Sequence, residues 1–182
     1  TYSALHDSLH DASSGIDEEA LDQLVPLLEK EGKVIISLEG GEIENHKNNI
    51  LEMNPNDMHS LLYYAELFIG DSQSMHVEAG LLGTPSVRSN KWVISEERVN
   101  VIDYLENECN MGISIAPGNT NVLIQSVVEL LNSNSKLNSR ELSKRFFREN
   151  TNLTDFLFWL LSNYPKSIEA YCMKSNVINQ FH

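Results

Sequence analysis

The sequence predicts an α/β fold built on a doubly wound parallel sheet, with extra helices at the C-terminal end. Two observations lead to this prediction. Short apolar runs alternate with segments of helical spacing along most of the chain, which is typical of parallel strands joined by crossover helices. Residues 61–89 contain a whole unit of this kind. There an apolar run ends at Gly70, and a helical pattern follows that stops at Gly83 before the next apolar run.

Composition and charge limit the classes of function. The chain has 182 residues, enough for one sizeable domain with its own core. Its formal net charge is −13, from 26 acidic and 13 basic residues. An acidic surface argues against nucleic acid or an anionic membrane as the main partner. The basic residues gather at 136–148, beside Glu141 and Glu149, and we interpret that cluster as a solvated helix face.

The cysteines and the apolar runs bear on the cellular compartment. Cys109 and Cys172 lie far apart with no partner motif, so we expect neither a disulfide framework nor a zinc site. This usage suits a reducing cytoplasm, where we expect the protein to act. No apolar run approaches the roughly 18 residues of a membrane-spanning helix, and no signal peptide is recognisable. Because the chain starts at Thr1 in ordinary domain sequence, we expect it to be a fragment of a longer protein.

The elements before residue 61 follow the same alternation. A helical pattern capped by Asp17 is expected to stop at Gly32, and Pro26 should kink or interrupt it. The β-branched apolar run at 33–38 predicts a strand buried on both faces. The other expected elements are the end of a strand at 2–5, loops at 6–15 and 39–48, a short strand at 49–53 and a helix at 57–66.

After residue 89 the spacing predicts mainly helices. The expected elements are a polar loop at 90–97, an amphipathic segment at 99–108, a strand at 113–116, a long helix from Thr120, a linker at 132–139, and helices at 140–150 and 154–163. The last helix has an apolar stripe that includes Phe156 and Trp159, and we expect it to pack on the domain or across to a second domain. We therefore expect a domain at 1–150 and terminal helices at 151–182.

The turn Asp71-Ser72-Gln73-Ser74 is the strongest candidate for a ligand site. It follows a predicted strand and precedes a predicted helix, at the edge where open α/β sheets bind ligands. Its hydroxyl side chains, its free N–H groups and the helix dipole suit a phosphate or pyrophosphate. The turn is not a P-loop, because Gly-Lys-Ser/Thr is absent, and it lacks the GxGxxG motif. The alternative is an ordinary polar turn without a ligand.

Two side chains extend this candidate site. Glu78 follows Ser74 by one helical turn, where its carboxylate can accept two hydrogen bonds from a vicinal diol such as ribose. Otherwise it is a solvated helix glutamate. His59 either meets a nucleobase or sugar from the neighbouring loop or is a surface histidine.

Other residues along the chain are candidates for different chemistries. His6-Asp7 and His10-Asp11 invite a metal site, but no third ligand cluster is evident. We favour a polar loop facing the ligand mouth and expect no metal. Glu39 and Gly40, in the loop after the predicted strand at 33–38, complete the substrate-binding candidates. A Ser/His/Asp hydrolase is excluded because Gly-x-Ser-x-Gly is missing.

Several short runs together resemble one known group of proteins. They are Ala65-Glu66-Leu67, Ile69–Ser72, Glu78-Ala79, Leu82–Pro85 and Arg88–Asn90, with His10-Asp11, Gly15-Ile16 and Asp155–Pro165 farther away. The chain resembles the C-terminal half of GT-B-fold nucleotide-sugar proteins, which include UDP-N-acetylglucosamine 2-epimerases and many glycosyltransferases. The resemblance is strongest to a bacterial and archaeal family of glycosyltransferase-like proteins described as a domain of unknown function.

The resemblance carries implications for the site and its partners. It implies two facing Rossmann-like domains, of which this chain is the C-terminal one. It implies that the Ser72–Ser74 turn binds a diphosphate and that Glu78 binds ribose. His10 and Asp11 would face the interdomain cleft as catalytic candidates. The implied substrate is an NDP-sugar, first of all a UDP-sugar, with no separate cofactor. The implied partner is an N-terminal Rossmann-like domain in cis or trans, and a homo-oligomer is left open. Gln73 departs from the glycine that is typical of the epimerases.

The sequence therefore predicts the nucleotide-sugar-binding half of a GT-B-like glycosyltransferase, which transfers a sugar from an NDP-sugar donor. A UDP-sugar 2-epimerase-like enzyme and a non-catalytic nucleotide-binding or assembly module are the alternatives. In such proteins the acceptor site and much of the catalytic apparatus usually belong to the N-terminal domain. We therefore expect the isolated chain to be inactive.

Overall fold

The computed structural model describes residues 15–38, 43, 45–51, 54–94, 100–173 and 177–181. The chain divides into two compact units, Thr1–Leu142 and Ser143–His182. The division falls inside α6 (Ser135–Glu149), and the domain bounds 1–150 and 151–182 stay a prediction.

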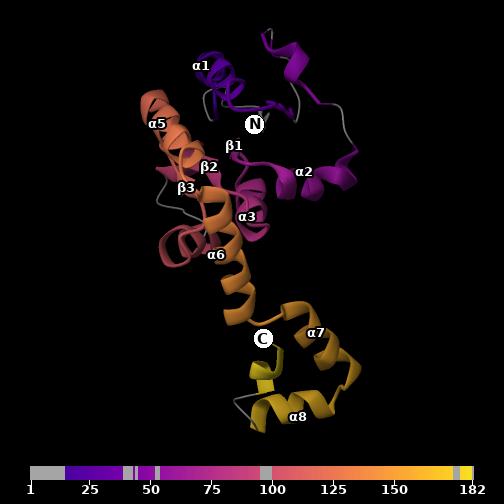
Figure 1. Cartoon of the computed structure of the whole chain (residues 1–182). Coiled ribbons are helices and arrows are strands. Elements are labelled where there is room, and N and C mark those ends of the chain that lie inside the picture. The colour runs from indigo at the N-terminus through magenta and orange to yellow at the C-terminus, as the bar shows by residue number, and fades with distance from the viewer. Residues whose placement is uncertain are drawn as a thin grey trace. The chain divides into compact units, whose positions relative to one another are not determined.

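Three short parallel strands form the sheet of the first unit (Figure 1). They are β1 (Phe68–Gly70), β2 (Ser86–Arg88) and β3 (Ile113–Ser114), in the order β1-β2-β3. In the register, Ile69 lies opposite Val87, and Val87 lies opposite Ile113. An α/β fold with a parallel sheet is thus confirmed. The doubly wound strand order stays a prediction.

The crossover unit predicted at residues 61–89 is present. β1 leads through a turn into α3 (Gln73–Leu81), which returns the chain to β2. Gly83 has a φ of 75°, a value that only glycine adopts without strain, and the Thr84 N–H donates to the Ala79 carbonyl at 2.8 Å. Glycine therefore ends the helix as the sequence predicts.

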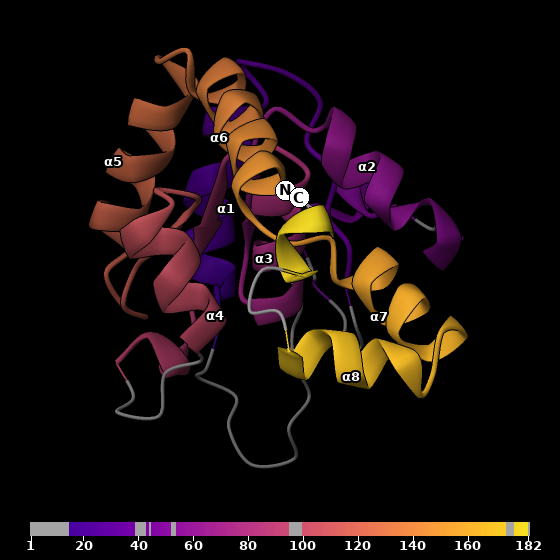
Figure 2. The same ribbon diagram turned by 90° about the horizontal axis from the view of Figure 1, so that it is seen from below.

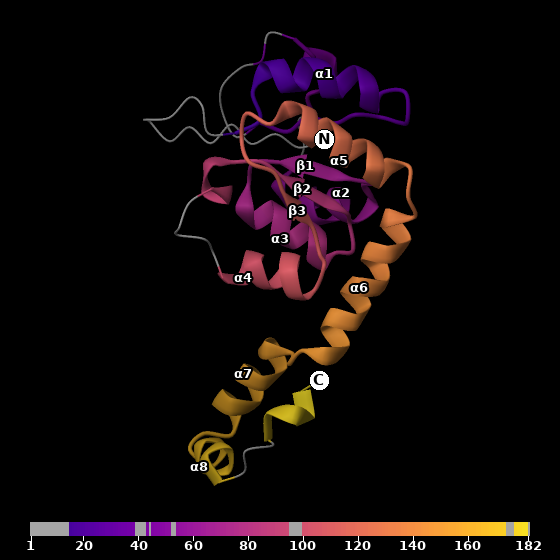
Figure 3. The same cartoon turned by 90° about the vertical axis from the view of Figure 1, so that its left-hand side faces the viewer.

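Helices cover both faces of this sheet (Figure 3). Ile69 and Val87 point into the larger core cluster, which α1 (Glu18–Leu28) and α5 (Thr120–Leu131) complete. Phe68, the neighbour of Ile69, points to the opposite face and packs with residues of α2 (Met58–Tyr64) and α3. This alternation along one strand is what a sheet buried on both faces requires.

Several predicted elements differ from the observed ones. The expected strands at 33–38 and 49–53 reduce to a single parallel bridge between Ile36 and Ile50 in the residues described. The expected linker at 132–139 is wrong, because α6 already begins at Ser135. α1 runs through Pro26 without interruption and ends at Leu28. Pro26 has no N–H to donate to the carbonyl four residues earlier, and the helix ends two residues after it.

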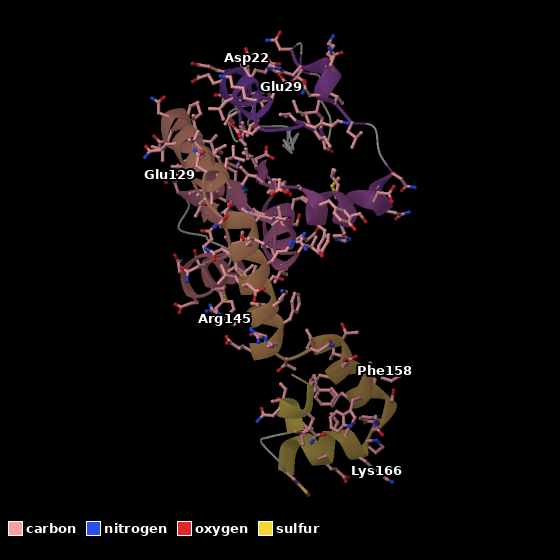
Figure 4. All side chains as sticks on the ribbon, viewed as in Figure 1. Asp22, Glu29, Glu129, Arg145, Phe158 and Lys166 are labelled. Atoms are coloured by element: carbon pink, nitrogen blue, oxygen red, sulfur yellow. The ribbon has the colours of Figure 1, made fainter. Side chains whose placement is uncertain are left out.

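Side-chain hydrogen bonds join the segment around residue 46 to α1. His46 Nε2 lies 2.8 Å from Asp22 Oδ1, and Asn49 Nδ2 donates to Glu29 Oε1 at 3.0 Å. Asp22 and Glu29 both lie on or just beyond α1 (Figure 4). These polar contacts hold the segment, together with the parallel bridge that joins it to the buried Ile36.

The second unit is a small helical unit with an aromatic core. α7 (Leu153–Ser162) and α8 (Lys166–Met173) pack on each other and on the 3-10 turn Val177–Phe181 (Figure 2). Its core is an aromatic cluster of Phe156, Trp159, Tyr171 and Phe181. Across the described residues of both units, no helix combines the length and apolar character needed to cross a membrane.

Candidate functional site

The carboxyl end of β1 leads directly into the predicted ligand turn. Asp71 is buried, and Ser72 caps α3 by accepting a hydrogen bond from the Met75 N–H at 3.4 Å. The Ser72 and Ser74 hydroxyl oxygens lie 3.3 Å apart. An extended backbone at Ser72, followed at once by helix, leaves N–H groups of the first turn directed out of the helix end. This is the local geometry that binds anions.

A second segment lies opposite this turn. Asn90 follows β2 by two residues, and its side-chain amide donates to the Asp71 carbonyl at 2.5 Å. The Asn90 side-chain oxygen accepts from the Trp92 N–H at 3.1 Å and so caps the 3-10 turn Lys91–Val93. Asn90 thereby joins the ends of two neighbouring strands and places Lys91 and Trp92 beside the turn.

The two segments enclose a cavity of about 290 Å³, which we call the edge cavity. Its lining residues are Asp71, Ser72, Gln73, Ser74, Asn90, Lys91 and Trp92. The Lys91 ammonium lies 5.7 Å from the centre of the Trp92 ring. The four turn residues are all among the site residues predicted from the sequence, whereas Asn90, Lys91 and Trp92 are not, and a ligand role for the turn stays a prediction. The place of these three residues directly after the next predicted strand could have indicated them, because the carboxyl ends of neighbouring parallel strands share one edge of the sheet.

Two more helix N-termini reach this edge of the sheet. A small cleft is lined by Gly15–Asp17 before α1, by Ser89 after β2, and by Gly118–Thr120 at the start of α5. The Asp71 carboxylate points toward this loop, since a Cβ at Gly15 would lie 2.2 Å from Asp71 Oδ2. Only glycine fits there. The N-termini of α1, α3 and α5 thus converge around the strand ends, and their dipoles favour negative charge at this edge.

Glu78 and His59 meet each other outside the lining of the edge cavity. His59 Nε2 lies 3.2 Å from Glu78 Oε2. The His59 side chain is 70% exposed and that of Glu78 is 38% exposed. The structure therefore brings these two predicted residues together, from α2 and α3. Their roles toward ribose and base stay predictions.

Four predicted site residues lie outside the described part of the chain. They are His10, Asp11, Glu39 and Gly40. Their catalytic and substrate-binding roles stay predictions. Among the residues that are described, no group of three His, Cys, Asp or Glu side chains is placed to hold a metal ion.

A buried polar network lies one helical turn from Ser72. His76 Nε2 donates to Glu106 Oε1 at 3.0 Å, and the Ser114 hydroxyl donates to the same oxygen. Arg88 donates to the Ser114 hydroxyl from Nε at 3.0 Å and from Nη2 at 2.8 Å. Burial raises the pKa of Glu106, but the hydrogen bonds and the Arg88 charge outweigh it, and the pKa lies below the usual 4.5. Sequence reasoning missed this network because its members are far apart in the chain.

Comparison with known proteins yields matches in structure only. No protein-family model matches the chain, and no curated protein matches it. One similar solved structure is described as the glycotransferase of kitacinnamycin, with 14% identity, a TM-score of 0.50, and coverage of 79% of this chain and 38% of that one. Another is the spinosyn forosaminyltransferase SpnP, with 16% identity, a TM-score of 0.48, and coverage of 79% and 38%.

The structural likeness concerns the fold. At 14% identity, the match to the kitacinnamycin glycotransferase shows a glycosyltransferase-like fold. It confirms the recognition made from the sequence, that the chain is like the C-terminal half of a GT-B glycosyltransferase. The chain spans 38% of the length of the solved glycosyltransferases it matches.

Proposed function

We propose that the chain is the nucleotide-sugar-binding half of a glycosyltransferase-like protein, with a doubly wound, Rossmann-like sheet and an NDP-sugar as donor substrate. One observation carries the proposal. In the edge cavity, an anion-binding helix terminus faces a lysine and an exposed tryptophan. A nucleoside diphosphate has the matching chemistry, because it joins a strongly negative diphosphate to a planar base.

Each part of the edge cavity has a role in this proposal. The Ser72 and Ser74 hydroxyls and the N–H groups of the first turn of α3 bind the diphosphate, and the Lys91 ammonium neutralises it. Trp92 has 42% of its surface exposed and offers a face on which a base stacks. The turn uses Gln73 where a glycine would let the phosphates approach the backbone more closely, so the hydroxyls carry more of the binding.

Catalysis by the whole protein needs more than this chain in our proposal. A partner domain in cis or trans supplies the acceptor site, and His10 and Asp11 are the candidates for a catalytic role. The fold match supports this division, because the chain spans 38% of the glycosyltransferase that it resembles in structure. The proposal places the protein in the cytoplasm, where nucleotide sugars are made, with the UDP-sugar as the first donor to test.

The same observation favours a second candidate, a non-catalytic nucleotide-binding module. A chain that holds the donor cavity and lacks a partner domain binds nucleotide without transferring sugar. The two candidates differ when a partner domain is added, because only the first then turns over a UDP-sugar. An epimerase-like enzyme would instead interconvert UDP-sugar epimers without any acceptor.

UDP binding can be measured on the chain itself through Trp92. The protein has two tryptophans, so Trp159→Phe leaves Trp92 as the single reporter. We expect UDP to quench this emission and to stabilise the chain by about 2.7 kcal/mol at about a hundred times Kd. Ser72→Ala with Ser74→Ala should weaken UDP binding by about tenfold or more, since two hydrogen bonds to charged oxygens are lost.

A matched control separates ligand binding from helix capping. Asn152 caps α7 in the same way that Ser72 caps α3, accepting from the Asp155 N–H at 3.2 Å. Asn152→Ala should therefore destabilise a helix and leave the UDP affinity unchanged. If UDP, dTDP and GDP all fail to quench Trp92 and to raise the melting temperature, the proposed function is wrong.

A further inference from the structure

The buried network of His76, Glu106, Ser114 and Arg88 joins the elements that form both walls of the edge cavity. His76 lies on α3, and its backbone N–H donates to the Ser72 carbonyl at 3.1 Å. Arg88 ends β2, two residues before Asn90. Glu106 connects the two walls, because one of its oxygens accepts from His76 and from Ser114, and the Ser114 hydroxyl in turn accepts from Arg88 at the end of β2.

The network lies in the interior of the first unit. His76 and Arg88 are each 2% exposed, and the Glu106 side chain is 9% exposed. Gly112 packs so closely that a Cβ there would lie 2.5 Å from His76 Cε1. The glycine has a φ of 88°, so the chain both bends sharply and leaves room for the imidazole at this point.

The local backbone around Glu106 is unusual. Residues Tyr104–Glu108 form a π-helical turn, and helices of this kind occur frequently at functional sites. On this turn the Glu106 side chain is only 9% exposed, whereas the nearby Glu108 is exposed. A rare backbone geometry therefore occurs where one carboxylate is buried.

Stability alone does not account for such a network. Well-packed apolar side chains of similar volume usually stabilise a core at least as well as buried charges do. Directional hydrogen bonds between buried polar groups, in contrast, favour one relative position of the elements that they join. In addition, the Nδ1 atom of His76 is buried without a hydrogen-bond partner among the described residues, which a network selected only for stability would not leave.

We propose that Glu106 is a positioning residue for the edge cavity and fixes the spacing between its two walls. Through His76 it holds the first turn of α3, and through Ser114 it holds the end of β2. The inference rests on the proposed nucleotide-binding function of that cavity. Glu106 itself does not line the cavity and acts through the residues that it holds.

Glu106→Gln and Glu108→Gln form a matched pair on one helical turn. We expect Glu106→Gln to raise the Kd for UDP by about tenfold, as the loss of an outer-shell partner does at metal sites. Glu108→Gln should leave the Kd unchanged, because Glu108 is exposed and its carboxylate lies outside the network. Hydrogen exchange at the amides of residues 72–75 and 91–93 should accelerate only in Glu106→Gln.

The histidine gives a second test that does not depend on how well Glu106→Gln folds. The amide nitrogen of glutamine reaches the position of His76 Nε2, whereas that of asparagine reaches only the position of Nδ1. Because Nε2 is the atom that contacts Glu106, His76→Gln should keep most of the UDP affinity and His76→Asn should lose it. Equal UDP affinities in the two variants would contradict the proposal.

The readouts separate this inference from the proposed function. If Glu106→Gln lowers the melting temperature but keeps the wild-type Kd and wild-type exchange at both walls, the network is structural and the inference is wrong. If the wild-type chain binds no nucleotide, the proposed function fails, and hydrogen exchange decides the inference alone. Faster exchange at both walls in Glu106→Gln, with none in Glu108→Gln, then still supports a positioning role.

Discussion

At the scale of single residues, the charge of Glu106 makes the stability of the first unit depend on pH. Its pKa lies below the usual 4.5 in the folded chain. The folded state therefore binds fewer protons than the unfolded chain near that pH. The stability that Glu106 contributes is present above about pH 4.5 and is lost as the pH falls through the lower folded value.

Glu106→Gln tests this dependence directly. We expect the difference in the free energy of unfolding between the wild type and Glu106→Gln to shrink as the pH falls from about 6 to about 3. Urea unfolding at several pH values measures it. Glu108→Gln should follow the wild-type pH profile. A constant difference between wild type and Glu106→Gln over this range would show that the carboxylate does not titrate with folding.

The residue types along the chain predict one wall of the candidate site, the turn Asp71–Ser74, and do not predict the other wall, which contains Lys91 and Trp92. The turn Asp71–Ser74 is predicted as a ligand site because its small hydroxyl side chains and free N–H groups stand between a strand and a helix N-terminus, where anions bind. Lys91 and Trp92 were assigned to a polar loop, since nothing local shows that this loop faces the turn. Their position follows from strand order and from the Asn90 hydrogen bond to Asp71, and neither is local information.

At the scale of elements, basic side chains of α6 cap the C-terminal end of α2. Lys136 Nζ donates to the carbonyls of Tyr63, at 3.0 Å, and of Ala65, and to the Thr84 hydroxyl at 2.6 Å. Arg140 donates to the Tyr63 carbonyl at 3.1 Å and lies 4.0 Å from the centre of the Tyr63 ring. The cluster at 136–148 is therefore not only a solvated face. The spacing predicted a helix only from residue 140, after a linker that includes Lys136, and could not reveal that another helix ends beside it.

Lys136→Met should destabilise the first unit by about 1–3 kcal/mol, because carbonyl groups at the end of α2 lose their donor.

Burial, with the nearby Arg140 charge, lowers the pKa of Lys136 from 10.5 to about 8. Between these values the folded state binds fewer protons than the unfolded chain, so the stability from Lys136 rises with pH in that window. Urea unfolding should thus show a larger cost of Lys136→Met near pH 9.5 than near pH 7. Lys30→Met, at an exposed lysine, should show no such cost, and an equal cost in both variants would contradict the capping role.

At the scale of the whole molecule, hydrophobic periodicity predicted the α/β class and the helices at the end of the chain. It could not show that the chain divides into two units within a helix. α6 is a continuous helix of 15 residues that runs across the division at Leu142. The division depends on which long-range contacts each half makes, and the aromatic cluster of the second unit draws only on residues beyond Asn150.

Phe156→Ala is expected to disrupt the second unit selectively. Phe156 is 9% exposed, and its ring lies 6.2 Å from that of Trp159 and 5.6 Å from that of Phe181. Removing a buried phenylalanine ring costs about 3–5 kcal/mol, which is as much as so small a core supplies. We therefore expect the emission of Trp159, measured in a Trp92→Phe background, to shift to the red. The helical signal and the urea midpoint of the first unit should persist.

Phe158→Ala is the matched control, because Phe158 lies on the same helix and is 73% exposed. It removes the same side chain from the surface, so the Trp159 emission should stay as in the wild type. If Phe156→Ala also abolishes the cooperative unfolding of the first unit, the two units fold as one and the aromatic cluster stabilises both. If neither variant moves the Trp159 emission, the aromatic cluster is not the core of the second unit.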